Sequence, residues 1–281
     1  MYRIVESEFV APSVKRFVVE APQVASHWRA GQFVILRVDD DGERIPLTVA
    51  AVDSEKGTIT LFVQGIGMTT ELLEMQEAGD SLADVAGPLG KPSEIEAYGV
   101  AAVVGGGVGT AIAYPIAVAL REAGNEVIAI VGARGREYVL LENELAATGA
   151  AVVPCTDDGS YGRHGFVTEA LADIIAARPI DVVFAAGPVP MMSAVAEVTR
   201  PQGIKTIASL NPIMVDGTGM CGGCRVDVGG ETKFACVDGP EFDAHLVDFA
   251  LLARRNQSYA DIEKRRLNEF ECHLETLPWQ N

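Results

Sequence analysis

Positive charge is scarce in this sequence of 281 residues, which has 22 Lys and Arg against 39 Asp and Glu and a formal net charge of −17. Nucleic acids and anionic membrane surfaces are bound mainly through Lys and Arg, so neither is expected as a partner. The remaining composition, 48% apolar and 22% charged, is typical of a globular protein and excludes a disordered or fibrous chain. The length predicts about two domains with a substantial core.

The N-terminal segment lacks the unbroken apolar core of a secretory signal, because Arg3, Glu6 and Glu8 interrupt it. We therefore expect a cytoplasmic protein. One uncharged run, residues 97–120, is long enough to cross a bilayer. Its glycines and Pro115 favour a strand, a glycine turn and a helix instead, so no membrane insertion is expected.

Cysteine is also sparse, and the odd total of five favours metal or redox chemistry over a disulfide framework. Three of the five are close in sequence, Cys221-x2-Cys224-x11-Cys236, and Asp216 lies five residues before the first. Thiolates bind zinc or iron–sulfur clusters, and the spacing alone leaves both open. The glycines between them allow a tight loop whose amides point at sulfur. Cys155, inside an apolar run, is predicted to be a buried small hydrophobe.

Three regions follow one another along the chain. Residues 1–97 contain short β-type runs separated by turns, which predicts an antiparallel barrel or sandwich, with one short helix at MTTELLEM. Residues 98–208 alternate apolar strands with helices, which predicts a doubly wound parallel sheet covered on both faces. Residues 209–281 are glycine-rich around the cysteines and end in a charged helical tail. The expected fold class is α/β plus all-β.

The segment GGGVGT, residues 105–110, lies between an apolar strand and an apolar helix. Such a turn lets backbone amides and a helix N-terminus approach a diphosphate. It departs from the strict G-x-G-x-x-G because Thr110 occupies the third glycine position, and Arg134 stands where an acidic residue would bind a ribose hydroxyl. The choice between NADH and NADPH stays open. Two later loops, at Asp158 and at Gly187-Pro188, follow strands of the same predicted sheet.

A second diphosphate site is suggested in the N-terminal region. RIPLT, residues 44–48, places a guanidinium beside an extended segment fixed by proline. QGIGMTTELL then combines a glycine turn with a helix start that Thr69 or Thr70 would cap. A cation and a helix N-terminus together can hold a diphosphate.

These motifs, in this order, resemble the ferredoxin–NADP reductase superfamily over nearly the whole chain: R-x-P-L-T, GGGVGTA, DDGSYGRHGFVT, AAGPVPMM and a C-terminal cysteine lobe. The branch containing the electron-transfer subunit of dihydroorotate dehydrogenase is similar, but it usually has Cys where Asp216 stands. With Asp at this position, the chain resembles the small (alpha) subunits of NADH-dependent reduced ferredoxin:NADP oxidoreductases, also called sulfide dehydrogenase subunits. The resemblance rests on Asp216 and on the segments NPIMVDGTGMCGGCRV and FACVDGPEFDAHLVDF.

The resemblance implies a role for each matching residue. Ala186 occupies a position where superfamily members often have Cys, so no thiol role is carried over there. The implied FAD ligands are Arg44, Pro46, Leu47, Thr48, Gly67, Thr69 and Thr70; the implied ligands of NAD(H) or NADP(H) are Gly105, Gly106, Gly107, Gly109, Thr110, Asp158, Gly187 and Pro188; and the implied ligands of a 2Fe-2S cluster are Asp216, Cys221, Cys224 and Cys236.

The implied function is electron transfer. Hydride would pass between NAD(H) and FAD, and single electrons would pass through the 2Fe-2S cluster to or from a large flavin and iron–sulfur subunit, as in electron bifurcation. Such transfer requires no acid–base side chain, so no catalytic residue is assigned. Two alternatives stay open: an electron-transfer subunit of dihydroorotate dehydrogenase, and a non-enzymatic redox sensor whose zinc or cluster lobe controls a partner.

Overall fold

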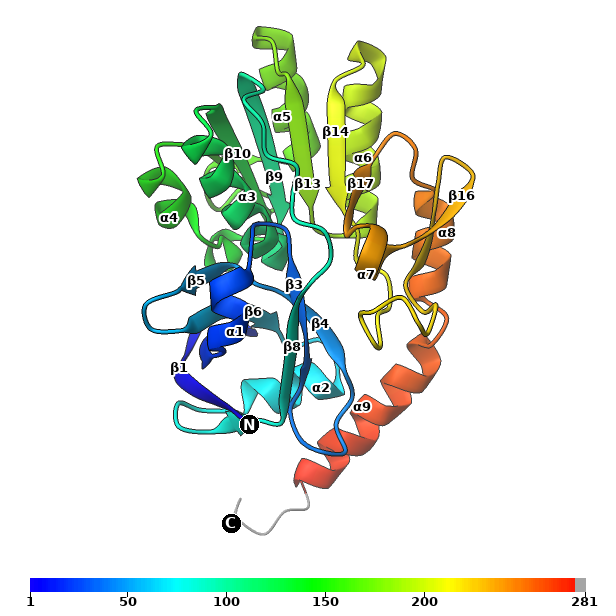
Figure 1. Cartoon of the computed structure of the whole chain (residues 1–281). Coiled ribbons are helices and arrows are strands. Elements are labelled where there is room, and N and C mark those ends of the chain that lie inside the picture. The colour runs from blue at the N-terminus through cyan, green and yellow to red at the C-terminus, as the bar shows by residue number, and fades with distance from the viewer. Residues whose placement is uncertain (276–281) are drawn as a thin grey trace.

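The computed structural model describes residues 1–275, and its N-terminal part consists of two antiparallel sheets (Figure 1). One sheet has the strand order β5-β6-β2-β1-β7 and the other the order β4-β3-β8. Two short helices, α1 (Pro22–His27) and α2 (Met68–Glu74), accompany them. The strands are β1 (Tyr2–Ala11), β2 (Val14–Glu20), β3 (Phe33–Arg37), β4 (Ile45–Thr48), β5 (Ala51–Asp53), β6 (Thr58–Gln64), β7 (Ser81–Leu82) and β8 (Asp84–Leu89).

Both sheets contribute to one apolar core. Phe17 of β2 and Ile59 of β6 pack in the same cluster as Leu36 of β3 and Val85 of β8. The expected antiparallel β fold is confirmed. Strand β1 was not among the predicted runs, because only Ile4 of its ten residues is buried and it therefore shows no apolar alternation.

A seven-stranded sheet follows, in the order β12-β11-β10-β9-β13-β14-β17, and all its strand pairs are parallel except β14 with β17. The strands are β9 (Val100–Gly106), β10 (Glu126–Ala133), β11 (Ala151–Thr156), β12 (Arg163–His164), β13 (Val182–Ala186), β14 (Lys205–Ser209) and β17 (Glu241–Asp243). The helical segments are η1 (Gly107–Gly109), α3 (Thr110–Glu122), η2 (Arg136–Tyr138), α4 (Glu142–Ala147), α5 (Val167–Ala177), α6 (Val189–Thr199) and η3 (Arg200–Gln202).

Helices cover both faces of this sheet. Leu120 of α3 and Leu145 of α4 pack on one face, while Leu171 of α5 and Val195 of α6 pack on the other. The predicted doubly wound architecture is confirmed. Residues 97–120 divide among β9, η1 and α3, and within residues 1–275 no helix is both long and apolar enough to span a bilayer.

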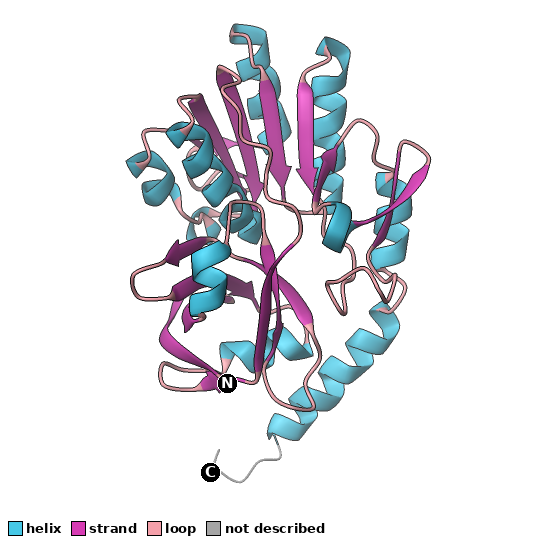
Figure 2. Cartoon of the chain, viewed as in Figure 1, coloured by secondary structure: helices cyan, strands magenta, loops and turns pink. Residues whose placement is uncertain are grey.

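The C-terminal region begins with a loop, followed by a hairpin of β15 (Arg225–Val228) and β16 (Glu231–Phe234) and by α7 (Ala235–Asp238) (Figure 2). Strand β17 then joins the large sheet. The predicted charged helical tail forms two helices, α8 (Phe249–Asn256) and α9 (Ala260–Glu275). Residues 276–281, the end of the predicted third region, lie outside the described part.

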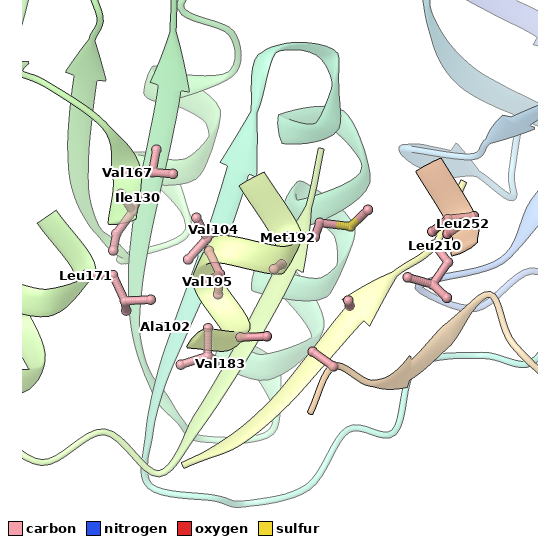
Figure 3. Close-up of a cluster of buried hydrophobic side chains, with 14 of the residues drawn as sticks. Ala102, Val104, Ile130, Val167, Leu171, Val183, Met192, Val195, Leu210 and Leu252 are labelled. Atoms are coloured by element: carbon pink, nitrogen blue, oxygen red, sulfur yellow. The ribbon is translucent and has the colours of Figure 1, made fainter. Parts of the chain in front are cut away.

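One apolar core connects the large sheet with the C-terminal region. Val183 and Val195 belong to the same cluster as Leu252 of α8 (Figure 3). Cys224 and Cys236 belong to this cluster too. The divisions 1–97, 98–208 and 209–281 remain predictions. Both this core and strand β17 join residues on the two sides of the boundary between 208 and 209.

Candidate functional site

The glycine turn packs against the end of β13. A β-carbon at Gly109 would collide with the carbonyl oxygen of Ala186, and one at Gly106 would collide with Met191. Because the obstacle at Gly109 is backbone, only glycine permits this close approach of the turn to β13 at that position. The structure brings together two loops that the sequence analysis selected separately, residues 105–110 and Gly187-Pro188.

Two features of this turn suit an incoming ligand. The hydroxyl oxygen of Thr110 is buried and has no hydrogen-bond partner among the described residues. Gly107 has a φ of +56°, and a β-carbon there would meet nothing within 4 Å. A buried polar atom usually has a partner, so the free Thr110 hydroxyl at the start of α3 is suited to bind a ligand.

Asp158 lies farther along the same sheet edge. Its carboxylate accepts hydrogen bonds from the Ser160 hydroxyl at 2.6 Å and the Ser160 amide at 2.9 Å, and these bonds lower the pKa of Asp158. Strand β10 separates β11 from β9, so Asp158 lies two strands away from the glycine turn. Arg134 is exposed directly after β10, and the Arg136 guanidinium lies 5.2 Å from the centre of the Tyr161 ring.

The N-terminal motifs also lie together. Thr69 donates a hydrogen bond to Glu43 at 3.2 Å, which ties α2 to the segment that carries Arg44. Arg44 is exposed, and among the described residues its side chain has no hydrogen bond or ion pair. Pro46, Leu47 and Thr48 belong to β4, where Thr48 pairs with Phe33 of β3. Strand β6 contacts η1, so the N-terminal sheets face the glycine turn.

The prediction that Thr69 or Thr70 caps the start of α2 is confirmed for Thr70, which acts from the third helical position, while Gly67 is the N-cap residue. The helix begins after Gly67, and the Thr70 hydroxyl accepts hydrogen bonds from the amides of Ile66 and Gly67, both at 3.0 Å. A threonine at the third helical position can reach back to the cap in this way. A β-carbon at Gly67 would meet nothing within 4 Å, so the space in front of this turn is open.

The cysteine loop, defined as residues 216–224, brings one predicted ligand into contact with Cys236 and ties Asp216 to the backbone of Cys221. The sulfur atoms of Cys224 and Cys236 are 3.2 Å apart and buried. The Asp216 carboxylate accepts hydrogen bonds from the Cys221 amide at 2.8 Å and from the Thr218 amide at 3.0 Å. Within residues 1–275, no three His, Cys, Asp or Glu side chains are arranged to hold a single metal ion.

Backbone amides point at two of the sulfur atoms. The Gly223 amide donates to Cys221 at 3.4 Å, and the Cys236 amide donates to Cys224 at 3.5 Å. Amide–sulfur hydrogen bonds are a known influence on thiolate ligands of iron–sulfur clusters. Burial, and next the hydrogen bond with Cys224, raise the pKa of Cys236 to about 12, while the Thr218 amide lowers the pKa of Asp216.

The other two cysteines are separate from this loop. Cys155 is buried in β11 as predicted, and burial raises the pKa of its thiol. Cys272 lies exposed on α9.

The sequence analysis missed a carboxyl group at the joint between the regions. The Ser93 hydroxyl donates a 2.6 Å hydrogen bond to Glu241 of β17, and burial raises the pKa of Glu241 to about 7. Nearby, the Lys91 amide donates to the Gly239 carbonyl at 2.6 Å. The two segments are 148 residues apart, so no local pattern could have indicated this contact.

Two antiparallel sheets that face the glycine turn of a doubly wound sheet define the class: this is a modular reductase of the ferredoxin-reductase fold. Two family models match, "Oxidoreductase FAD-binding domain" over residues 1–93 and "Iron-sulfur cluster binding domain of dihydroorotate dehydrogenase B" over residues 211–248. The second match contains the cysteine loop and Cys236.

The chain belongs to the family of dihydroorotate dehydrogenase B electron-transfer subunits. A homologue of that subunit from Thermotoga maritima is 46% identical over 267 residues, covering 95% of this chain and 94% of the relative. The subunit from Bacillus caldolyticus is 38% identical over 225 residues, covering 76% of this chain and 84% of its own length.

A solved chain is similar over its full length. It comes from a structure of NADH-dependent reduced ferredoxin-NADP oxidoreductase, described as giving insight into flavin-based electron bifurcation. The TM-score is 0.92 and the identity 44%, with 96% of this chain and 98% of that chain covered. The resemblance inferred from the sequence motifs is thereby confirmed.

Proposed function

We propose that this chain is the electron-transfer subunit of a cytoplasmic NADH-dependent ferredoxin:NADP oxidoreductase. Hydride would pass between NAD(H) and FAD, and single electrons would pass through a 2Fe-2S cluster to or from a large flavin and iron–sulfur subunit. One observation carries the proposal: the N-terminal sheets, which match an FAD-binding domain, contact the glycine turn, and the same chain contains the cysteine loop. A flavin, when bound, exchanges both hydride and single electrons.

The N-terminal residues would bind the flavin. Arg44 would neutralise diphosphate charge, and its free guanidinium supports this role. Pro46, Leu47 and Thr48 would line the ring site along β4, because they lie in one extended strand. Gly67, Thr69 and Thr70 would complete the site at the open turn before α2.

The glycine turn would bind the nicotinamide nucleotide. Gly105, Gly106, Gly107 and Gly109 allow the backbone to approach a diphosphate, and the free Thr110 hydroxyl would hydrogen-bond to it. Gly187 and Pro188 would lie on the nicotinamide side, since they pack against the turn. Asp158, two strands away, would contact the adenosine half.

The cysteine loop and Cys236 would bind the cluster. A 2Fe-2S cluster takes two protein ligands on each iron, so paired donors suit it better than a single ion. Cys224 and Cys236 form one such pair through their sulfur atoms, and Asp216 is held beside Cys221 by its hydrogen bond to the Cys221 backbone amide. This donor set of three thiolates and one carboxylate fits an iron–sulfur centre.

The test compares two buried cysteines in the full chain, purified without air. We expect Cys224→Ser to lose most of its iron and keep FAD, whereas Cys155→Ser, equally buried and outside the loop, should keep both. Iron, sulfide and flavin analysis gives the measurement, and NADH should bleach the flavin bands of the wild type. Zinc without iron in the wild type would contradict the proposal.

One further candidate has direct support from the relatives. The Thermotoga maritima and Bacillus caldolyticus proteins carry the name of the dihydroorotate dehydrogenase B electron-transfer subunit. Asp216, in a position where that branch usually has Cys, favours the first proposal. Anaerobic purification from the native host separates the two: a large flavin and iron–sulfur subunit supports the first, and an orotate-forming flavoprotein supports the second.

A further inference from the structure

Helix α8 presents two polar side chains to the cysteine loop. The helix is fixed at its start by Asp248, whose carboxylate accepts a hydrogen bond from the Leu251 amide at 2.8 Å. Leu252 is 1% exposed and packs in the core near Leu210 (Figure 3). Residues three and four positions after Leu252 share its helix face. Arg255 and Asn256 therefore face inward toward the lobe.

The contacts of these two side chains hold the loop segment. The Arg255 guanidinium donates a hydrogen bond to the Gly223 carbonyl at 3.3 Å, and the Asn256 amide donates to the Asn211 carbonyl at 3.1 Å. Gly223 stands between Cys221 and Cys224, and its own amide donates to the Cys221 sulfur at 3.4 Å. Gly223 is thus held through its carbonyl by Arg255 and through its amide by Cys221.

The charge of Arg255 is not neutralised locally. Among the described residues no carboxylate forms an ion pair with it, and the hydrogen bond to Gly223 is its one polar side-chain contact. Arg178 and Arg200, by contrast, form ion pairs with Glu126 and Glu197. Arg255 is partly buried, so solvent and salt screen its charge less than that of an exposed arginine.

We infer that Arg255 is a positioning residue for the iron–sulfur centre: it fixes Gly223 and its unpaired positive charge raises the reduction potential of the cluster. The inference rests on the proposed function, since it requires Asp216, Cys221, Cys224 and Cys236 to hold that cluster. Reduction adds one negative charge to the centre, and a nearby positive charge stabilises the reduced form more than the oxidised form.

The experiment uses the full chain, purified anaerobically, and measures the midpoint potential of the cluster by a redox titration followed by electron paramagnetic resonance. Arg255→Gln removes the charge but retains a hydrogen-bond donor, and Arg255→Lys retains the charge. The matched control is Arg254→Gln, which removes the same charge from the exposed side of the same helix.

We expect Arg255→Gln to lower the equilibrium constant for cluster reduction about tenfold, which is ~59 mV for a one-electron couple. Arg255→Lys and Arg254→Gln should stay within about twofold of the wild type, ~18 mV on the same scale. An unchanged potential in Arg255→Gln would overturn the inference, as would an equal shift in Arg254→Gln.

Iron content decides the remaining cases. Arg255→Gln itself fails to retain iron in one possible outcome. In that case, an Arg255→Lys variant that binds iron and has the wild-type potential supports a requirement for the charge. An Arg255→Lys variant without iron contradicts that requirement. A wild-type chain with zinc and no iron would overturn the proposed function and this inference together. An iron-loaded wild type with an insensitive Arg255→Gln variant would overturn the inference alone.

Discussion

At the scale of single residues, Glu241 makes the stability of the protein depend on pH. Burial raises the pKa of its carboxyl from an ordinary 4.5 to about 7. Between these values the folded chain binds more protons than the unfolded chain, so the free energy of unfolding decreases as pH rises. The contribution of Glu241 is fully present below about pH 4.5 and is lost as pH rises through about 7.

Glu241→Gln should remove this dependence, because glutamine stays neutral. The difference in unfolding free energy, variant minus wild type, should increase by on the order of 2 kcal/mol from about pH 5 to about pH 8. Denaturant titrations at both pH values measure the change. The control is Glu96→Gln, which changes an exposed carboxylate three residues after Ser93 and should show almost no difference. An equal response of the two variants would contradict the assignment.

Single residues also mark how far sequence reasoning reached at the candidate site. Cysteine spacing selected Cys224 and Cys236, and the structure places their sulfur atoms in contact. Arg255 gave no signal, because a basic residue near the end of a charged helix is ordinary until the loop 32 positions earlier lies beside it. Contacts of this kind depend on packing between distant segments, which a local pattern does not encode.

At the scale of elements, helix α2 is held at its end by a buried lysine. Lys15 of β2 is 1% exposed, and its ammonium donates hydrogen bonds to the carbonyls of Glu74 and Gln76, both at 2.8 Å, and to the Glu77 carboxylate at 2.9 Å. A cation near a helix C-terminus also interacts favourably with the helix dipole. Lys15 thereby fixes the helix whose other end lies at the predicted flavin site.

Lys15→Met should reduce the free energy of unfolding by about 2–4 kcal/mol, because it leaves two partly buried carbonyls without their donor. The neighbouring Arg16→Met is the control: Arg16 pairs with Glu6 and Glu8 at the surface, and its loss should cost at most about 1 kcal/mol. Urea unfolding of both variants gives the comparison. A cost for Lys15→Met no larger than that of the control would show that the hydrogen bonds do not stabilise α2.

Elements with continuous apolar runs were the easiest to predict. Strands β9, β10 and β13 are almost entirely buried, and helices alternate with them as the pattern of residues 98–208 predicted. The tail was harder, because its apolar spacing continues across the interruption between Asn256 and Ala260. Periodicity indicates which face is buried, but without a Gly or Pro signal it does not show where a helix ends.

At the scale of the whole molecule, helix α9 runs from the C-terminal region toward α2 and contacts it (Figure 1). Most of the side chains of α9 that the structure describes are exposed. Removal of residues 260–281 should therefore lower the free energy of unfolding by less than about 2 kcal/mol and leave FAD and iron content unchanged, since Leu252 and Arg255 remain.

Cofactor analysis and thermal unfolding of the truncated chain test this expectation. Loss of iron would show that α9 supports the cysteine loop.

The order of the three regions was predictable because each has its own local pattern. The insertion of β17 into the large sheet was not, because its three residues carry no strand signal and pair with β14 across more than thirty positions of intervening chain.

Strand β17 also affects how copies of the molecule meet. The edge strands of a sheet have free amides and carbonyls that can pair with strands of other molecules, and this is a common route to aggregation. Here the two edge strands are β12, two residues long, and β17, three residues long. A strand of another molecule could pair with few backbone groups at either edge, so the large sheet is protected against growth into a fibril.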